Sequence, residues 1–233
     1  MNSNSCIFEF DKTFDVDFLV GTDEAGRGPA AGGVFAAAVH INDFEIAKEL
    51  TKLNDSKKLS AKVREELYDV ILNNTVNSVV CVEVEDIEKY NILNCSLKAM
   101  KLSCENVINK GCIQQAKTLC HPAFELQNIH KNILTIVDGN KLIRNYDYPQ
   151  QYIIKGDSKS ASIAAASILA KVTRDRYMQK LHEEHPQYNW AKNAGYLTKE
   201  HIEAIKKYGI TKYHRKSFLK NILPQKTEQL SLL

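Results

Sequence analysis

The sequence predicts an α/β protein in which helices flank a central β-sheet, with a small helical C-terminal extension. Two apolar runs, Phe18–Thr22 and Gly32–Ile41, are joined by a glycine-rich turn, which predicts an antiparallel hairpin at the centre of the sheet. A later run, Asn132–Asp138, is again an apolar strand that ends in a carboxylate. From Ser158 onward the chain is rich in alanine and isoleucine on all sides, which is typical of a helix buried against a sheet.

The remaining elements are predicted from shorter signals. Ser60 is a typical helix N-cap before Ala61–Asn73, and Thr198 has the same role before a helix that reaches Tyr208 and ends at Gly209. The other expected elements are a short helix over Phe44–Leu50, a strand over Asn77–Glu85, a helix over Asp86–Asn109 continued by Ile113–His121, and a short strand over Gln151–Lys155.

Length and composition indicate one large domain with a small appendage. For 233 residues we expect a main domain over residues 1–185 and a basic helical extension over residues 186–233, separated at His185-Pro186. The N-terminus has no basic region followed by a long apolar stretch, and no run approaches the roughly 18 apolar residues of a membrane span. Six cysteines without a C-x-x-C pair favour free thiols, so we expect a cytoplasmic protein.

The net charge of +3 conceals an uneven distribution. From His185 to the end, nine lysines and arginines face three glutamates, a net charge of +6, which leaves 22 basic and 25 acidic residues, a net charge of −3, for the rest. A basic tail interleaved with aromatic residues suits a polyanion whose bases or sugars can stack. A solvated helical surface is the alternative. The aromatic residues are Tyr188, Trp190, Tyr196, Tyr208, Tyr213 and Phe218.

Four carboxylates stand out, three of them at strand ends or just after a predicted strand, where open α/β sheets place their sites: Asp23, Glu24, Asp138 and Asp157. Adjacent acids about 4 Å apart repel by about 4 kcal/mol at an effective dielectric of roughly 20, so a bound cation or proton would stabilise them. An all-carboxylate set suits Mg²⁺ or Mn²⁺, and two such ions are a standard device for in-line attack on a phosphodiester. The alternatives are a helix cap for Asp157 and a simple turn at Asp138-Gly139.

A glycine loop follows the first pair of acids. Gly26 and Gly28 allow the backbone to approach a ligand closely, and Arg27 offers a planar fork suited to phosphate. A solvated turn is the alternative. The loop resembles the dinucleotide-binding G-x-G-x-x-A pattern, but the preceding carboxylates would repel a pyrophosphate and the next segment is predicted to be a strand.

Five segments carry a resemblance to one family: Gly21–Gly28, Asp55–Ser60, Val137–Gly139, Lys155–Lys171 and Gly195–His201. In this order they resemble the motif series of bacterial ribonuclease HII, and together they span about Phe18 to Phe218. The resemblance implies a ribonuclease H-like fold with a central mixed sheet. It also implies cleavage of RNA in RNA–DNA hybrids and cleavage on the 5′ side of a ribonucleotide embedded in duplex DNA.

The resemblance also implies roles for individual residues. Asp23, Glu24, Asp138 and Asp157 match the metal-binding catalytic acids. Gly26, Arg27 and Gly28 match the loop that senses the ribose 2′-hydroxyl, and Tyr196 matches the tyrosine that packs against the sugar. Leu197 stands where the family has glycine, which puts the placement of Tyr196 in question. The expected phosphate contacts are Lys57, Lys58, Lys159, Ser160 and the tail lysines.

The sequence also suggests partners and two competing interpretations. The tail Gln229–Leu233 resembles the pentapeptide by which bacterial replication proteins bind the sliding clamp; a frayed end is the alternative. Ribonuclease HIII resembles the same core but has an added N-terminal domain and lacks the loop arginine, so Arg27 and the short segment before Phe18 favour type HII. A non-catalytic hybrid-binding module would have no reason to keep all four acids. We expect a monomer without membrane contact.

Overall fold

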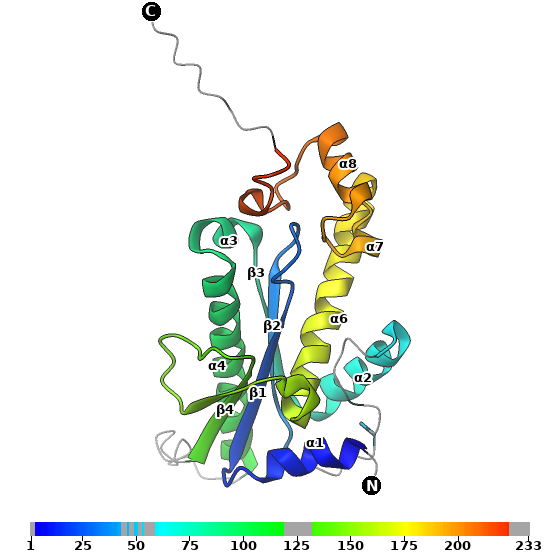
Figure 1. Ribbon diagram of the computed structural model, residues 1–233. Coiled ribbons are helices and arrows are strands. Elements are labelled where there is room, and N and C mark those ends of the chain that lie inside the picture. Colours follow the sequence, from blue (N-terminus) through cyan, green and yellow to red (C-terminus); the bar gives the residue numbers. More distant parts are fainter. Residues whose placement is uncertain are drawn as a thin grey trace, which may run out of the picture.

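The computed structural model describes residues 3–42, 46, 49–50, 53, 59–118 and 132–223. Its centre is a five-stranded mixed sheet in the order β3-β2-β1-β4-β5 (Figure 1). The strands β1 and β2 are antiparallel, as are β2 and β3, whereas β4 is parallel to both β1 and β5. The predicted central hairpin and the mixed sheet are therefore confirmed. The strands are β1 Phe18–Ala25, β2 Val34–His40, β3 Val76–Val82, β4 Ile133–Asp138 and β5 Gln150–Ile153.

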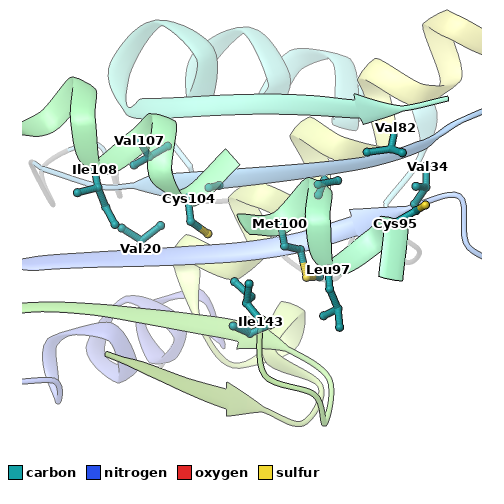
Figure 2. Close-up of a cluster of buried hydrophobic side chains, with 14 of the residues drawn as sticks. Val20, Val34, Val82, Cys95, Leu97, Met100, Cys104, Val107, Ile108 and Ile143 are labelled. Carbon is teal, nitrogen blue, oxygen red and sulfur yellow. The ribbon is translucent and has the colours of Figure 1, made fainter. Parts of the chain in front are cut away.

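Two long helices cover the opposite faces of this sheet (Figure 1). Helix α4 (Ile92–Thr118) packs on one face, and α6 (Ala161–Glu184) packs on the other. Side chains of β2 alternate between the two layers: Val34 belongs to the core beneath α4, whereas Ala37 belongs to the core beneath α6. Figure 2 shows Val20 of β1 beside Val107 and Ile108 of α4, and Val34 of β2 beside Cys95 of α4.

Small residues let α6 lie close to the central strand. A Cβ atom added at Gly21 of β1 would lie 2.4 Å from the carbonyl carbon of Ser162, so no other residue fits there without a shift. The first ten residues of α6 are all buried, which confirms the predicted apolar helix. The helix begins at Ala161 and is capped by Ser160, whose Oγ accepts a hydrogen bond from the Ile163 N–H at 3.2 Å.

Several elements differ from the sequence-based expectation. The single helix expected over residues 86–109 is two helices, α3 (Val84–Tyr90) and α4, because Asn91 between them adopts a positive φ of 65°. Helix α1 (Ser3–Lys12) is not among the expected elements; the carboxylate of Asp11 accepts hydrogen bonds from both the N–H and the hydroxyl of Ser162, each at 2.8 Å. Ser60 does cap α2 (Ala61–Asn74). Most of residues 44–50 lies outside the described residues.

The chain beyond residue 185 packs on the end of α6 and on the glycine loop. It contains α7 (Trp190–Asn193), α8 (Lys199–Tyr208) and two 3₁₀ turns, Pro186–Tyr188 and Lys216–Phe218. Trp190 and Leu219 share a hydrophobic cluster with Met178 of α6 and with Ala30 and Ala31 of the loop. The division at residue 185 stays a prediction. Across the described ranges, every helix is too short or too polar to traverse a bilayer.

Candidate active site

The ends of the parallel strands β1 and β4 bring two of the predicted acids to one edge of the sheet. Thr22 of β1 is in register with Val137 of β4, so the next residues, Asp23 and Asp138, follow side by side. Asp23 is only 7% exposed, and one of its carboxylate oxygens accepts a hydrogen bond from the N–H of Glu24 at 2.7 Å. This edge is the carboxyl end of the strands, where α/β sheets place their sites.

A tight turn after β5 brings the fourth acid to the same edge. Asp157 lies in the 3₁₀ turn Gly156–Ser158 and is buried. The N–H of Gly156 donates a hydrogen bond of 2.6 Å to the Asp138 carboxylate, which ties this turn to the end of β4. A Cβ at Gly156 would lie 2.6 Å from Cδ1 of Ile163, so a larger residue there would have to displace the end of this buried side chain.

The acids at this edge repel one another. Burial raises the pKa of Asp23 well above its ordinary value, and the negative charges of Glu24 and Asp138 raise it further. A hydrogen bond from the Glu24 N–H and one from the Ser167 hydroxyl act in the opposite direction without cancelling the shift. The carboxylate oxygens of this region therefore fit a hard divalent cation, whose charge would relieve the repulsion.

The carboxylate of Glu24 forms an ion pair with Arg27. One oxygen of the Glu24 carboxylate lies 3.0 Å from Nη1 of Arg27, whose side chain is 49% exposed. Within the described ranges, no group of three or more His, Cys, Asp and Glu side chains is arranged to hold a metal ion. The structure thus brings Asp23, Glu24 and Asp138 within interaction range, and the gathering of all four acids around metal ions stays a prediction. The Glu24 side chain is 15% exposed and that of Arg27 is about half exposed, so solvent screens the pair from the arginine side, and a divalent ion could replace Arg27 as the partner of Glu24.

A small cavity opens beside these acids. Its volume is about 80 Å³, and Glu24, Arg27 and Asp138 line it together with the start of the loop after β4 and one side of α4. Glu24 and Asp138 thus have access from solvent on the α4 side of the sheet. The remaining lining residues are Leu93, Ser96, Leu97, Met100, Val137, Gly139, Asn140 and Lys141.

The glycine loop after β1 is fixed from beneath by the buried arginine Arg215. Its side chain is 0% exposed, and its guanidinium donates hydrogen bonds to five carbonyl groups of the loop. Burial, and secondarily the nearby cation of Arg174, lower the pKa of Arg215 to about 10. Guanidinium carries five N–H donors in a rigid fork, so this one residue fixes most of the loop backbone. The acceptors are the carbonyls of Gly26, Arg27, Pro29, Gly32 and Gly33, at 2.7–3.2 Å.

Arg174 of α6 connects the same loop to the segment that carries Tyr196. It is buried, and it donates to the carbonyls of Ala31 and Gly33 in the loop and to that of Ala194. A Cβ at Gly26, where φ is +100°, would lie 2.2 Å from Nε of Arg174. The first loop glycine is therefore required both by its backbone conformation and by this contact.

Tyr196 lies against the glycine loop. A Cβ at Gly28 would lie 3.2 Å from Cε1 of Tyr196, and the side chain of Tyr196 is 54% exposed. The ring therefore covers Gly28 and still offers a face to a ligand. Leu197 is not among the described residues with positive φ, so its position needs no glycine and the substitution leaves Tyr196 beside the loop.

A histidine fixes the backbone of this tyrosine. Nδ1 of His201 lies 2.9 Å from the Tyr196 carbonyl, and because a carbonyl can only accept, Nδ1 carries the proton. Nε2 of His201 then accepts the indole N–H of Trp190 at 3.1 Å. Burial lowers the pKa of His201, which keeps the ring neutral and suits this arrangement. Neither His201 nor the two buried arginines can be identified from the sequence, because tail cations and histidines look alike whether they face solvent or the interior.

The residues expected to contact phosphates or the sliding clamp differ in exposure, and some lie outside the described residues. Lys159 is exposed just after the turn that carries Asp157. Ser160 is fully buried and its hydroxyl caps α6, so we leave it out of the proposed substrate surface. Lys57, Lys58 and the tail Gln229–Leu233 lie outside the described residues.

Comparison with solved structures defines the class. The chain resembles an archaeal protein in "Structure of the PCNA:RNase HII complex from Archaeoglobus fulgidus", with a TM-score of 0.59, 25% identity, and coverage of 91% of this chain and 98% of that one. It also matches "Crystal structure of Bst-RNase HIII in complex with Mn2+", with a TM-score of 0.61 and 16% identity over 90% of this chain and 67% of that one, a likeness of fold alone. The protein therefore has a ribonuclease H-like fold.

Sequence comparison then identifies the family. The model of the family Ribonuclease HII matches residues 20–221. A Ribonuclease HII of Fusobacterium nucleatum is 45% identical over 219 residues, 93% of each chain, and one of Flavobacterium psychrophilum is 46% identical over 208 residues, 89% of this chain and 92% of the relative. The chain belongs to the ribonuclease HII family. It is a ribonuclease H, an endonuclease of the divalent-metal-dependent hydrolase class.

Proposed function

We propose that this enzyme hydrolyses the RNA strand of RNA–DNA hybrids and also cuts on the 5′ side of a single ribonucleotide embedded in duplex DNA. The observation that carries the second activity is the contact between Tyr196 and Gly28. The glycine loop continues directly from Asp23 and Glu24, so the phosphate to be cut and the neighbouring sugar would lie at adjacent places. The 2′-hydroxyl is the group by which a protein distinguishes RNA from DNA.

In this proposal Asp23, Glu24, Asp138 and Asp157 hold Mg²⁺ or Mn²⁺. Bound there, two such ions would activate a water and would stabilise the departing 3′-oxygen, so the products would carry 3′-hydroxyl and 5′-phosphate ends. The negative charge at the strand ends supports this assignment, because burial and then the charges of Glu24 and Asp138 raise the pKa of Asp23, and a divalent ion there would offset both. Glu24 would leave Arg27 when it binds an ion, which frees the guanidinium for a substrate phosphate.

The loop and the tyrosine would recognise the ribose. The guanidinium of Arg215 donates hydrogen bonds to the loop carbonyls, so the loop backbone keeps one conformation before substrate binds. Backbone groups of Gly26 and Gly28 would meet the 2′-hydroxyl, and the exposed face of Tyr196 would pack on the sugar. The exposed Lys159, with Lys57 and Lys58 as the resemblance implies, would hold flanking phosphates.

The proposal is tested with a duplex that carries one ribonucleotide and with a uniform RNA–DNA hybrid. Each is incubated with the enzyme with Mg²⁺, with Mn²⁺ and with EDTA, and the cut position and end groups are mapped. We expect cleavage 5′ of the ribonucleotide only with a divalent ion. Cleavage of the hybrid without cleavage of the single-ribonucleotide duplex would favour a ribonuclease HIII-type activity and would contradict the role given to Tyr196 and Gly28.

We also propose that the tail Gln229–Leu233 binds the replication sliding clamp. The archaeal relative was solved in a PCNA:RNase HII complex, which supports a clamp interaction for this family member. A pull-down would compare the full chain with one that ends at Glu228, each with the bacterial clamp. Equal recovery of the clamp by the two chains would contradict the proposal.

A further inference from the structure

A second hollow, larger than the cavity beside the acids, lies between α4 and the loop that follows β4. Its volume is about 370 Å³. Three cationic side chains, two amides and one leucine line it, and no carboxylate does. We call it the basic pocket; its lining residues are Asn94, Leu97, Lys98, Lys101, Arg144 and Asn145.

Neutral groups hold two of its cations in place. Nη1 of Arg144 donates a hydrogen bond of 2.7 Å to Oδ1 of Asn94, and Nζ of Lys101 donates to the carbonyl of Asn145. Asn145 adopts a positive φ of 52°, a conformation that asparagine tolerates better than most residues. These partners orient the charges without neutralising them, and Arg144 keeps further N–H donors for a ligand.

The charge of the basic pocket is positive. Within the described residues, Arg144 has no ion pair with a carboxylate. Lys98 lies 2.8 Å from Asp86, but these side chains are 50% and 39% exposed. Such a pair is worth about 0–1 kcal/mol, so the ammonium can turn to another anion at little cost. Three cations against the carboxylates of Asp86 and Glu105 leave a net charge of +1.

The basic pocket adjoins the acids at the strand ends. Leu97 lines both hollows, and the loop after β4 supplies Gly139 to Lys141 to the small cavity and Arg144 and Asn145 to the basic pocket. A nucleic-acid strand whose phosphate reaches the acids would therefore place another of its phosphates, or one of the opposite strand, over the basic pocket.

We propose that the basic pocket binds one backbone phosphate of the nucleic-acid duplex that flanks the phosphate to be cut. The inference rests on the proposed function, since it assumes that a duplex reaches the acids. Arg144 and Lys98 are the phosphate ligands, and Asn94 is a positioning residue that orients Arg144. The contact fixes the register of the duplex and carries no information about base sequence.

The test compares Arg144→Gln and Lys98→Gln, singly and together, with wild type and with Lys12→Gln. Lys12 is a matched control, since it also pairs with one exposed carboxylate, Glu9 at 2.9 Å, and its side chain is 47% exposed. Dissociation constants of a fluorescent RNA–DNA hybrid are measured with EDTA at several salt concentrations. The slope of log K against log salt changes by about 0.7–0.9 for each phosphate that the protein no longer neutralises.

We expect the double variant to bind the hybrid about 10-fold more weakly at low salt. The slope of log K against log salt should be less steep by about 1, because one phosphate is no longer neutralised. With Mg²⁺ its KM should rise while kcat stays within about twofold. A second arm replaces single backbone phosphates by neutral methylphosphonates. A methylphosphonate at one position should weaken binding by wild type and by Lys12→Gln, but it should not weaken binding by the double variant. If the double variant has the same salt-dependence slope and the same methylphosphonate profile as wild type, the basic pocket is not a phosphate site. If wild type itself cuts neither substrate, the proposed function fails instead.

Discussion

The glycine loop and the acids at the strand ends are adjacent in sequence but are stabilised in opposite ways. The loop carbonyls of Gly26, Pro29 and Gly32 are bound by the buried guanidinium of Arg215. By contrast, Asp23 is buried beside like charges that raise its pKa. The loop carbonyls are therefore satisfied by the chain itself, whereas Asp23 is held beside like charges. The loop needs no ligand to keep its conformation, and a bound cation would relieve the repulsion at Asp23.

The comparison makes opposite forecasts for substitutions in the two regions. Removing an acid should destroy activity without harming the fold, because the acid is a source of repulsion in the metal-free protein. Removing a group beneath the loop should harm the fold and the selectivity together, because that group satisfies buried carbonyls.

The largest expected effect is that of Asp23→Asn on cleavage. The amide keeps the size of the side chain but removes the charge that would bind a divalent ion, so the rate with Mg²⁺ should fall at least ~1,000-fold. Binding of a hybrid in EDTA should stay measurable. The exposed Asp147→Asn is the control and should retain full activity. Mg²⁺-dependent cutting at more than a few per cent of the wild-type rate would refute the role of Asp23.

Arg215→Lys should have the next largest effect, on the single-ribonucleotide substrate. An ammonium has three donors against five carbonyl groups to satisfy, so the loop loses part of its support. We expect kcat/KM for the single ribonucleotide to fall about 100-fold and that for the hybrid about 10-fold, with the unfolding free energy lower by about 2–3 kcal/mol.

A matched control is Lys216→Arg, at the next position of the chain, where the side chain is exposed. It should behave as wild type on both substrates. If Arg215→Lys reduced both activities in the same proportion as its folded fraction, the residue would have only a structural role and the loop would not be the selective element.

Arg215 also marks what the sequence alone can and cannot predict. The hairpin, the buried helix α6 and the acids at strand ends follow local patterns of apolar residues and glycines, so the sequence predicts them. The role of Arg215 depends on a contact across more than 180 residues, from the C-terminal extension to Gly32. No local pattern distinguishes such a buried arginine from the solvated lysines around it. The same is true of Arg174, which continues the charged stretch of α6.

The sequence also does not predict the helix break at Asn91 or the capping role of Ser160, for a different reason. Asn91 interrupts an otherwise helical pattern through a positive φ, and Ser160 uses its hydroxyl on its own helix. Both are backbone effects that an interpretation based on hydrophobic periodicity does not register. The resemblance suggests a phosphate contact for Ser160, and in the structure its hydroxyl accepts a hydrogen bond from the Ile163 N–H at the start of the adjacent helix.

Tyr196→Ala should reduce cutting at a single ribonucleotide about 10-fold more than cutting of a long hybrid. A hybrid offers ribose at many sites, so the loss of one sugar contact matters less there. Tyr196→Phe keeps the ring that lies beside Gly28 and should retain most of the selectivity. The measurement is the ratio of kcat/KM on the two substrates. An equal loss on both would contradict a sugar-reading role.

The stability of the metal-free protein should depend on pH through Asp23. Its folded-state pKa lies above the unfolded value, so the folded state binds the extra proton between the two values, and stability falls as pH rises from about 4 through the folded pKa. Asp23→Asn removes this loss, so its Tm at pH 8 should exceed that of wild type by a few degrees, about 2–4 °C for each kcal/mol. Calorimetry in EDTA at pH 5 and pH 8 measures it, and a lower Tm for the variant at pH 8 would contradict the repulsion argument.

The smallest effect comes from Arg27, the one residue that belongs to both regions. Its guanidinium pairs with Glu24 and so competes with a divalent ion for that carboxylate, while its backbone carbonyl is bound by Arg215. Arg27→Ala removes the competitor and leaves the carbonyl in place. The half-saturating Mg²⁺ concentration should therefore fall about threefold, a modest change because solvent screens the pair from the half-exposed arginine side. Activity measured across a Mg²⁺ titration tests this. An unchanged or higher half-saturating concentration would mean that Arg27 already aids ion binding, and the two regions would then be less independent than their contacts indicate.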